Sequence, residues 1–276
     1  MSLSHSQSTA EEVSNFYSSI RDYWANLSTS VSGTPSCMLN FGCWDAQAPD
    51  LFTAQAQFCQ HLLDFVPHGR QPLSGLEIGC GIGGISLEML RALPGLQMSA
   101  LDISIQQLAV ATANALVAGL SDRVTWHEGS SMAIPAVEAS YDFTLCVESS
   151  FHYDDKPKFF SENLRVLKPG GIAVVADITC SDVERIKLRR GNHFEGNAAY
   201  LKLIREAGFE LREMRSIGKD VYRPLYEFVL QFNDHHRSPV GKYWATVLRN
   251  YATLADEGLM DYCIFVMKKP TTRRFS

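Results

Sequence analysis

The sequence lacks cysteine pairs at the spacing of zinc or redox sites. Its seven cysteines are odd in number and scattered, with no CxxC pair among them. They are Cys37, Cys43, Cys59, Cys80, Cys146, Cys180 and Cys263. Such a distribution favours neither a disulfide framework nor a metal site. We expect reduced thiols that pack as small apolar residues, and no metal.

Excess positive charge and long apolar runs are also absent. The 25 Lys and Arg residues are outnumbered by 30 Asp and Glu residues, which gives a formal net charge of -5. This charge does not attract nucleic acid or an anionic membrane. No apolar run approaches the ~18 residues that span a bilayer, and the N-terminus lacks a basic region followed by an apolar one. We expect a soluble, cytoplasmic protein with neither nucleic acid nor membrane as partner.

The N-terminal part is rich in aromatic residues. Thr9 and Glu12 have capping-box spacing and precede an apolar stripe, which predicts an amphipathic helix over residues 8–24. A turn-rich loop at 32–45 with exposed aromatics and a helix near 51–65 follow. The stripe is too apolar to stand in water alone. We expect residues 1–58 to form a helical lid that also contributes to a homo-oligomer.

Beyond this lid the apolar pattern alternates between strands and helices. Strands are predicted near 75–78, 97–101, 124–127, 142–147 and 172–176, and helices near 83–92, 104–119 and 156–167. Later come a helix at 197–208, a strand at 209–218, a helical segment at 221–257 and a strand at 261–269. This order predicts a single α/β domain over residues 1–276, with a doubly wound, seven-stranded, mostly parallel sheet. Its parts are a core at 60–218, a helical cap at 219–258 and a last strand at 259–270.

Carboxylates recur where the predicted strands end. Glu77, Asp102, Glu148 and Asp177 each end a strand, at the edge where open α/β sheets bind their ligands. Glycines in "GLEIGCGIGG" satisfy GxGxxG, which is typical of dinucleotide sites. However, Glu77 beside that turn would repel phosphates. S-adenosylmethionine carries an ammonium and a sulfonium and no phosphate, so this cofactor fits better.

Four stretches resemble the successive motifs of class I S-adenosylmethionine-dependent methyltransferases: "LEIGCGIGG", "LDIS", "YDFTLCVESSFHY" and "RVLKPGGIAVVADI". The resemblance implies a Rossmann-like methyltransferase fold, S-adenosyl-L-methionine as cosubstrate and S-adenosyl-L-homocysteine as product. It assigns the methionine moiety to Glu77 and the glycine turn, and the ribose to Asp102. Ser130 stands where many relatives have Asp. The predicted cofactor-binding residues are Phe41, Trp44, Glu77, Gly79, Cys80, Gly81, Asp102, Ile103, Gln107, Ser130, Ser131 and Val147.

The stretches "NFGCWD" and "VESSFHYDD" are similar to enzymes that methylate sugars, tocopherols, sterols or isoprenoid chains. In the sugar O-methyltransferases a histidine follows the "ES" pair and serves as base, and His152 has this place. In prenyl and sterol C-methyltransferases an acid and aromatics act instead, and Glu148 and Phe151 match them. The resemblance leaves both reactions open.

We expect carbon methylation, because methylation of an alkene leaves a carbocation that aromatic faces stabilise. The predicted catalytic residues are Glu148, His152 and Tyr200. The predicted substrate-binding residues are Tyr23, Phe151, Tyr153, Phe194, Tyr222 and Tyr226. The expected acceptor is a hydrophobic small molecule with an attached prenyl or terpenoid group, as in the similar teleocidin-type indole alkaloid C-methyltransferases, with rearrangement or cyclisation after methyl transfer.

Three alternatives accompany this expectation. Oxygen methylation of a sugar or phenol would use His152 as general base. A free prenyl diphosphate would need a basic cluster, but the run at Lys187, Arg189 and Arg190 is more typical of a solvated face. A non-catalytic ligand-binding or scaffold protein is the third, since fold does not imply function.

Overall fold

The computed structural model describes residues 21–27, 36–45, 48–67, 73–186, 191–235 and 239–271. Most of the helix predicted at 8–24 lies outside these residues, whereas residues 21–27 are helical. The basic run at 187–190 also lies outside them.

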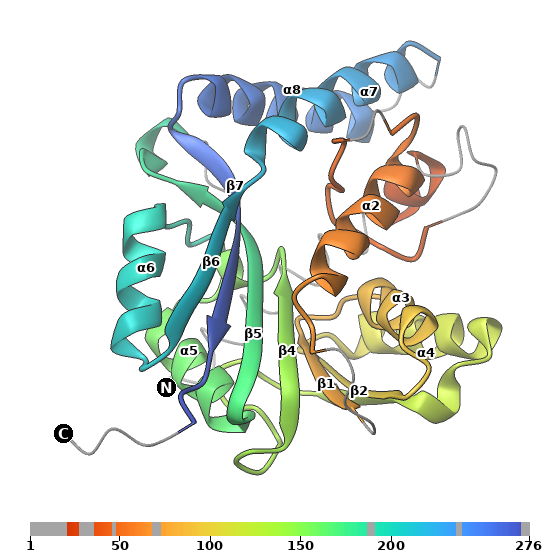
Figure 1. Cartoon of the computed structure of the whole chain (residues 1–276). Coiled ribbons are helices and arrows are strands. Elements are labelled where there is room, and N and C mark those ends of the chain that lie inside the picture. Colours follow the sequence, from red (N-terminus) through yellow and green to blue (C-terminus); the bar gives the residue numbers. More distant parts are fainter. Residues whose placement is uncertain are drawn as a thin grey trace, which may run out of the picture.

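The centre of the protein is a seven-stranded sheet in the order β3-β2-β1-β4-β5-β7-β6 (Figure 1). The strands are β1 (Leu73–Ile78), β2 (Leu96–Asp102), β3 (Val124–Glu128), β4 (Tyr141–Val147), β5 (Leu167–Cys180), β6 (Glu210–Ser216) and β7 (Met260–Lys268). The first five are parallel, and β7 runs antiparallel between β5 and β6. The predicted seven-stranded, mostly parallel sheet is confirmed.

Helices cover both faces of this sheet. They are α2 (Leu51–Leu63), α3 (Gly84–Ala92), α4 (Ile105–Ala118), α5 (Lys156–Val166) and α6 (Asn197–Glu206). Successive residues of β5 alternate between two apolar clusters: Val174 joins the cluster that contains α2, α3 and α4, and Val175 joins the one that contains α5 and α6. This period of two explains why the strands are apolar on both faces.

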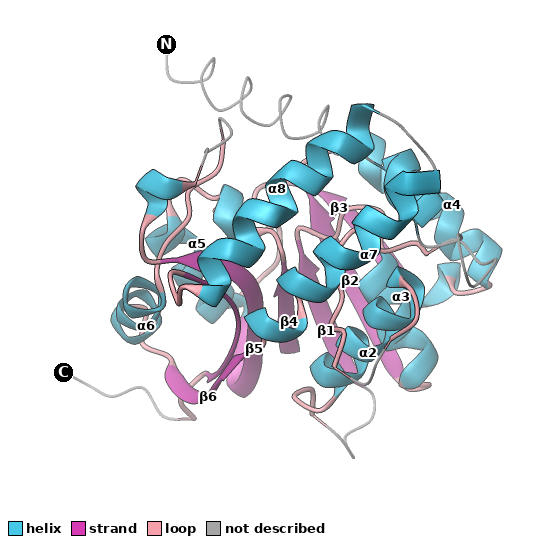
Figure 2. Ribbon diagram, turned by 90° about the horizontal axis from the view of Figure 1, so that it is seen from above, coloured by secondary structure: helices cyan, strands magenta, loops and turns pink. Residues whose placement is uncertain are grey.

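A helical cap joins β6 to β7. Helices α7 (Tyr222–His235) and α8 (Pro239–Asp256) lie over one edge of the sheet, so the predicted helical segment at 221–257 consists of two helices (Figures 1 and 2). Trp24 packs against Trp244 of α8 with ring centroids 4.8 Å apart, and Phe41 packs against Trp244 at 6.0 Å. The N-terminal segments and the cap therefore share one aromatic core.

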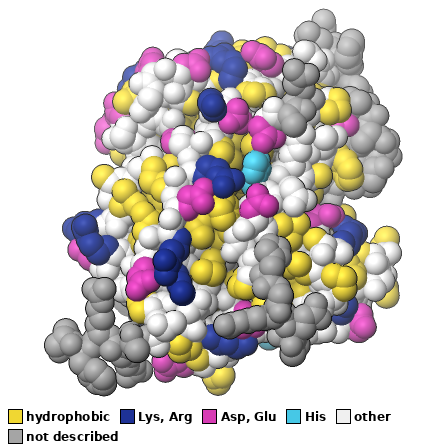
Figure 3. Space-filling model, viewed as in Figure 1, with side chains coloured by type: hydrophobic (Ala, Val, Ile, Leu, Met, Phe, Trp, Pro, Cys, Tyr) yellow, Lys and Arg dark blue, Asp and Glu magenta, His cyan; other side chains and the backbone are white. Residues whose placement is uncertain are grey.

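The face seen in Figure 3 mixes charges of both signs with scattered apolar side chains. Ion pairs such as Arg212–Glu210 and Arg215–Glu213 lie on the surface of β6. Among the described residues, no helix combines the length and the hydropathy that crossing a membrane requires.

Candidate active site

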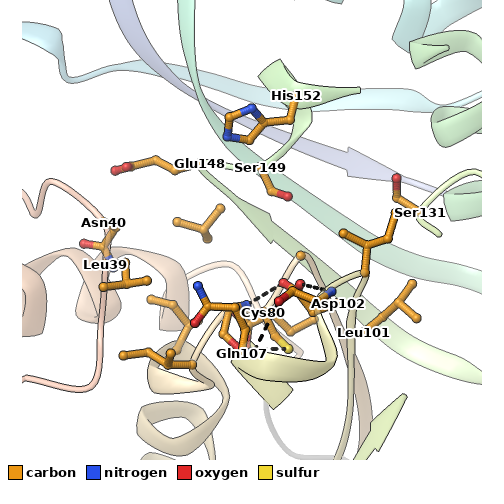
Figure 4. Close-up of a pocket in the computed structure, with 18 of the residues that line it drawn as sticks. Leu39, Asn40, Cys80, Leu101, Asp102, Gln107, Ser131, Glu148, Ser149 and His152 are labelled. Atoms are coloured by element: carbon orange, nitrogen blue, oxygen red, sulfur yellow. Dashed lines mark hydrogen bonds between the residues drawn. The ribbon is translucent and has the colours of Figure 1, made fainter. Parts of the chain in front are cut away.

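A cavity of about 560 Å³ opens at the carboxyl ends of the parallel strands. Residues that end β1, β2, β3 and β4 line it, together with residues 37–40 of the N-terminal loop. Parallel strands bring their carboxyl ends to one edge, so residues far apart in sequence meet here. The close-up in Figure 4 shows both sides of the cavity, with Glu148, Ser149 and His152 above Cys80, Asp102 and Gln107.

The glycine turn after β1 permits close approach of backbone segments. Gly79 has φ +75°, and a Cβ there would collide with the side chain of Ser149. A Cβ at Gly84 would collide with the carbonyl of Cys37 in the N-terminal loop. These glycines let the loop and the end of β4 pack closely around the cavity.

Glu77 is buried with 2% exposure and lines the cavity. Its Oε2 accepts a 2.9 Å hydrogen bond from the backbone N–H of Ser86 and another from the Ser86 hydroxyl. The described residues supply no donor to Oε1. Burial raises the pKa of Glu77 to about 7. A cationic ligand group at Oε1 would offset the cost of burying this carboxylate.

Asp102 ends β2 on the opposite side of the turn. Its Oδ2 accepts from the Gly81 backbone N–H at 2.8 Å, and its Oδ1 accepts from the Ser104 N–H at 2.9 Å. Burial raises the pKa of Asp102, and these N–H groups oppose that shift. Each carboxylate oxygen keeps a further lone pair, which suits a pair of ligand hydroxyls.

The buried amide of Gln107 fits a polar ligand. It is 3% exposed and lines the cavity, yet neither its side-chain oxygen nor its nitrogen has a hydrogen-bond partner within the described residues. Leaving buried polar groups unpaired is costly, so such groups are usually satisfied. With Glu77 and Asp102, this amide makes the cavity fit a ligand that carries both a cation and several hydrogen-bonding groups, such as S-adenosylmethionine.

Glu148 follows β4 with an unusual backbone φ of 44°. Its Oε1 accepts from the Phe41 backbone N–H at 2.7 Å and from the Tyr262 hydroxyl at 3.0 Å. Burial raises the pKa of Glu148 to about 8. A non-glycine residue in the left-handed region costs energy, and such residues cluster at functional sites.

His152 lies in the short 3₁₀ helix η2 (Ser150–His152) and lines the same cavity. Its Nδ1 is 3.1 Å from the carbonyl oxygen of Gly191. A carbonyl oxygen only accepts hydrogen bonds, so the neutral ring carries its proton on Nδ1 and its basic lone pair on Nε2.

The cavity lining is acidic. Among the described residues that line it are five carboxylates and neither Lys nor Arg. The carboxylates are Glu77, Asp102, Glu128, Glu148 and Asp154. An acidic lining without a described Lys or Arg suits a sulfonium cofactor and disfavours an anionic acceptor.

The structure brings most predicted site residues together. Of the predicted cofactor-binding residues, those that line the cavity are Glu77, Gly79, Cys80, Gly81, Asp102, Ile103, Gln107, Ser130, Ser131 and Val147. Glu148, His152 and Tyr153 line it as well.

Phe41 and Trp44 do not line the cavity, and the expectation that this loop exposes its aromatics is wrong. They are only 5% and 8% exposed, because Phe41 packs against Trp244 and Trp44 packs against Phe228 of the cap. Only the backbone of Phe41 reaches the site, through its hydrogen bond to Glu148.

Five predicted substrate aromatics also lie outside this cavity. They are Tyr23, Phe151, Phe194, Tyr222 and Tyr226. Each of them contacts other side chains of the apolar core that the cap and the N-terminal segments share. Tyr153 is the one member of the predicted substrate set that lines the cavity.

Tyr200, one of the predicted catalytic residues, does not line the cavity. Tyr200 is fully buried in the cluster around α5 and α6, where its ring stacks on Phe265 at 5.0 Å. Its hydroxyl donates to Asp177 at 2.9 Å and lies 2.8 Å from the hydroxyl of Ser150. Tyr200 therefore supports the segment beneath His152 without lining the cavity.

The sequence did not single out Leu39, Asn40 and Ser149 as lining residues. Leu39 and Asn40 belong to the loop before Phe41, and two backbone carbonyls of that loop accept from the Gln55 side chain at 3.2 and 2.7 Å. The turn-rich composition of the loop did not indicate that these residues would line the cavity. For Ser149, the sequence signal was its position directly after the predicted catalytic residue Glu148 in "VESS".

Comparison with known proteins agrees with this geometry. Residues 76–171 match the family model described as a methyltransferase domain. The erythromycin 3''-O-methyltransferase of Saccharopolyspora erythraea is 23% identical over 265 residues, which cover 86% of this chain and 85% of that protein.

Two solved structures share the fold. The [4+2]-cyclase SpnF has a TM-score of 0.76 and 23% identity, and the match covers 95% of this chain and 97% of that chain. The geranyl diphosphate C-methyltransferase from Streptomyces coelicolor A3(2), in complex with Mg²⁺, geranyl diphosphate and S-adenosyl-L-homocysteine, has a TM-score of 0.72 and 17% identity, over 92% and 98% of the two chains. Residues 76–171 are therefore a methyltransferase domain, and the chain has the Rossmann-like methyltransferase fold.

Proposed function

We propose that the enzyme methylates a hydroxyl oxygen of a small natural product, with His152 as general base. The observation that carries this proposal is the contact between His152 Nδ1 and the Gly191 carbonyl, which leaves the basic lone pair on Nε2. Oxygen methylation needs a base near the hydroxyl. The erythromycin 3''-O-methyltransferase, which is matched over 85% of its length, is also named for oxygen methylation.

The bound cosubstrate would supply a methyl group on a sulfonium. We assign its ammonium to Glu77, its ribose hydroxyls to Asp102 and one of its polar edges to Gln107. The acceptor oxygen would then form a bond to the methyl carbon as the carbon–sulfur bond breaks, and its proton would pass to His152. The main task of the remaining walls is to hold the acceptor in line with the methyl group and away from water.

The acceptor class follows from the charge of the cavity. Because no described Lys or Arg lines it, we propose a neutral or cationic acceptor and not a free diphosphate. Cytoplasmic location and a homo-oligomeric state stay predictions.

Carbon methylation of a prenyl or terpenoid chain is the second candidate. Glu148 favours it, since the ionised form of this carboxyl at the cavity edge would accept the proton that a carbocation loses, and its raised pKa makes that form a stronger base. It ranks second because Tyr153 is the one aromatic of the predicted substrate set in the cavity, whereas carbocation chemistry relies on several aromatic faces.

The position of the new methyl group separates the two candidates. Purified enzyme would be incubated with extract of the producing cells and S-adenosylmethionine that carries ¹³C in its methyl group. Mass spectrometry isolates the labelled product, and NMR locates the label. A methyl on oxygen is expected. A methyl on carbon would support carbon methylation of a prenyl or terpenoid chain instead. No labelled product in any extract would favour a non-catalytic protein.

A further inference from the structure

The tautomer of His152 depends on where residues 191–196 lie, because Gly191 supplies the carbonyl that accepts from Nδ1. This segment contacts η2 at further points. The backbone N–H of His193 donates to the Phe151 carbonyl at 2.6 Å, and Phe194 stacks on Phe151 with ring centroids 5.3 Å apart. The segment and η2 therefore form one packed unit at the acceptor side of the cavity.

Lys156 links the two parts of this unit. Its ammonium donates to the carbonyl of Tyr153, directly after η2, at 3.1 Å. It also donates to the carbonyl of His193 in the facing segment. One cation thus bridges two backbone segments, and His193 is only two residues from Gly191.

The placement of Lys156 is otherwise unfavourable. It is 4% exposed, and burying an ammonium is costly. It is also the first residue of α5, where the helix dipole disfavours a positive charge. Burial lowers the pKa of Lys156, while the nearby carboxylates of Asp177, Glu195 and Asp154 oppose this shift. Burial and the helix N-terminus both disfavour this cation, so we expect a specific contact to compensate for its placement.

We propose that Lys156 is a positioning residue: it holds residues 191–196 against η2, so that Gly191 keeps the proton of His152 on Nδ1 and the basic lone pair on Nε2. The catalytic meaning of this device rests on the proposed role of His152 as base. The structural part stands on these five contacts alone.

The direct test is the tautomer of His152 in the full-length protein. Histidine would be labelled with ¹⁵N, and long-range ¹H–¹⁵N spectra would be recorded at about pH 8, where an ordinary histidine is neutral. His152→Gln assigns the signal. The unmodified protein should show a protonated Nδ1 and an unprotonated Nε2. Lys156→Met keeps the aliphatic stem without the donors and should shift the tautomer ratio about fivefold or more, the factor of one typical hydrogen bond.

Lys158→Met is the matched control on the same helix. The Lys158 side chain is 52% exposed and lies 3.8 Å from Glu162, so its loss should leave the His152 spectrum unchanged. Affinity for S-adenosylhomocysteine, measured by calorimetry, verifies that each variant is folded. Should Lys156→Met not fold, Lys156→Gln is measured in the same way.

The proposal is overturned when a folded Lys156 variant keeps the single tautomer of the unmodified protein, or when Lys158→Met shifts the ratio equally. Its failure is distinguishable from failure of the proposed function. If His152→Ala leaves methyl transfer intact while Lys156→Met still shifts the tautomer, then His152 is not the base but Lys156 still positions it.

Discussion

The backbone N–H of Phe41 donates a 2.7 Å hydrogen bond to Oε1 of Glu148, although the two residues are 107 positions apart. Phe41 belongs to the N-terminal loop, and Glu148 follows β4 and lines the cavity. The bond therefore joins the N-terminal loop to the sheet beside the cavity. Its acceptor is a carboxyl whose pKa is raised to about 8.

The first prediction is a pH dependence of stability that comes from Glu148. Its pKa rises from an ordinary 4.5 to about 8 on folding. The folded state thus keeps a proton that the unfolded chain loses, so this stabilisation is complete below the unfolded value and is lost as the pH rises through the folded value. Without cosubstrate, the protein should lose more free energy of unfolding between about pH 5 and 8 than Glu148→Gln. Urea unfolding of both proteins across this pH range measures the free energy of unfolding. Equal losses in the two proteins would refute the prediction.

The second prediction concerns the cosubstrate. Glu77→Gln should weaken binding of S-adenosylmethionine by about 1.5–3 kcal/mol, the scale of a hydrogen bond to a charged group, because Gln cannot offer a carboxylate to the ammonium. Isothermal calorimetry measures the change. Glu88→Gln is the control, since Glu88 is partly exposed on α3 and pairs with Arg91. Tight NAD binding by the unmodified protein, without binding of S-adenosylhomocysteine, would contradict the assignment.

The third prediction tests the link between the N-terminal segment and the cap. Trp24 is 2% exposed, packs against Trp244, and donates from Nε1 to the Asn40 carbonyl at 3.3 Å. Trp24→Ala should lower the free energy of unfolding by about 3–5 kcal/mol, as large-to-small changes in a core do. The neighbouring exposed residue Asp22 supplies the control, Asp22→Ala, which should unfold like the unmodified protein. Equal unfolding midpoints for both variants would show that the segment is not part of the core.

The sheet was predictable because buried parallel strands are continuous apolar runs, and the topology then brings their ends together. Glu77, Asp102 and Glu148 reach one cavity for this reason. The aromatics of the N-terminal loop were not predictable, since a loop has no periodicity that separates buried from exposed positions. Tyr200 was misjudged at the start of a helix, although its spacing of four from Ile204 indicates a shared buried face.

The central claim is that His152 accepts the proton of an acceptor hydroxyl. Once an acceptor has been isolated, the decisive measurement is the rate of methyl transfer by His152→Ala at saturating cosubstrate, beside Tyr200→Phe as control. We predict that His152→Ala lowers the rate about 10²–10⁴-fold with unchanged affinity for S-adenosylhomocysteine, the range for loss of a general base, whereas Tyr200→Phe stays active. Full activity of His152→Ala would contradict the account.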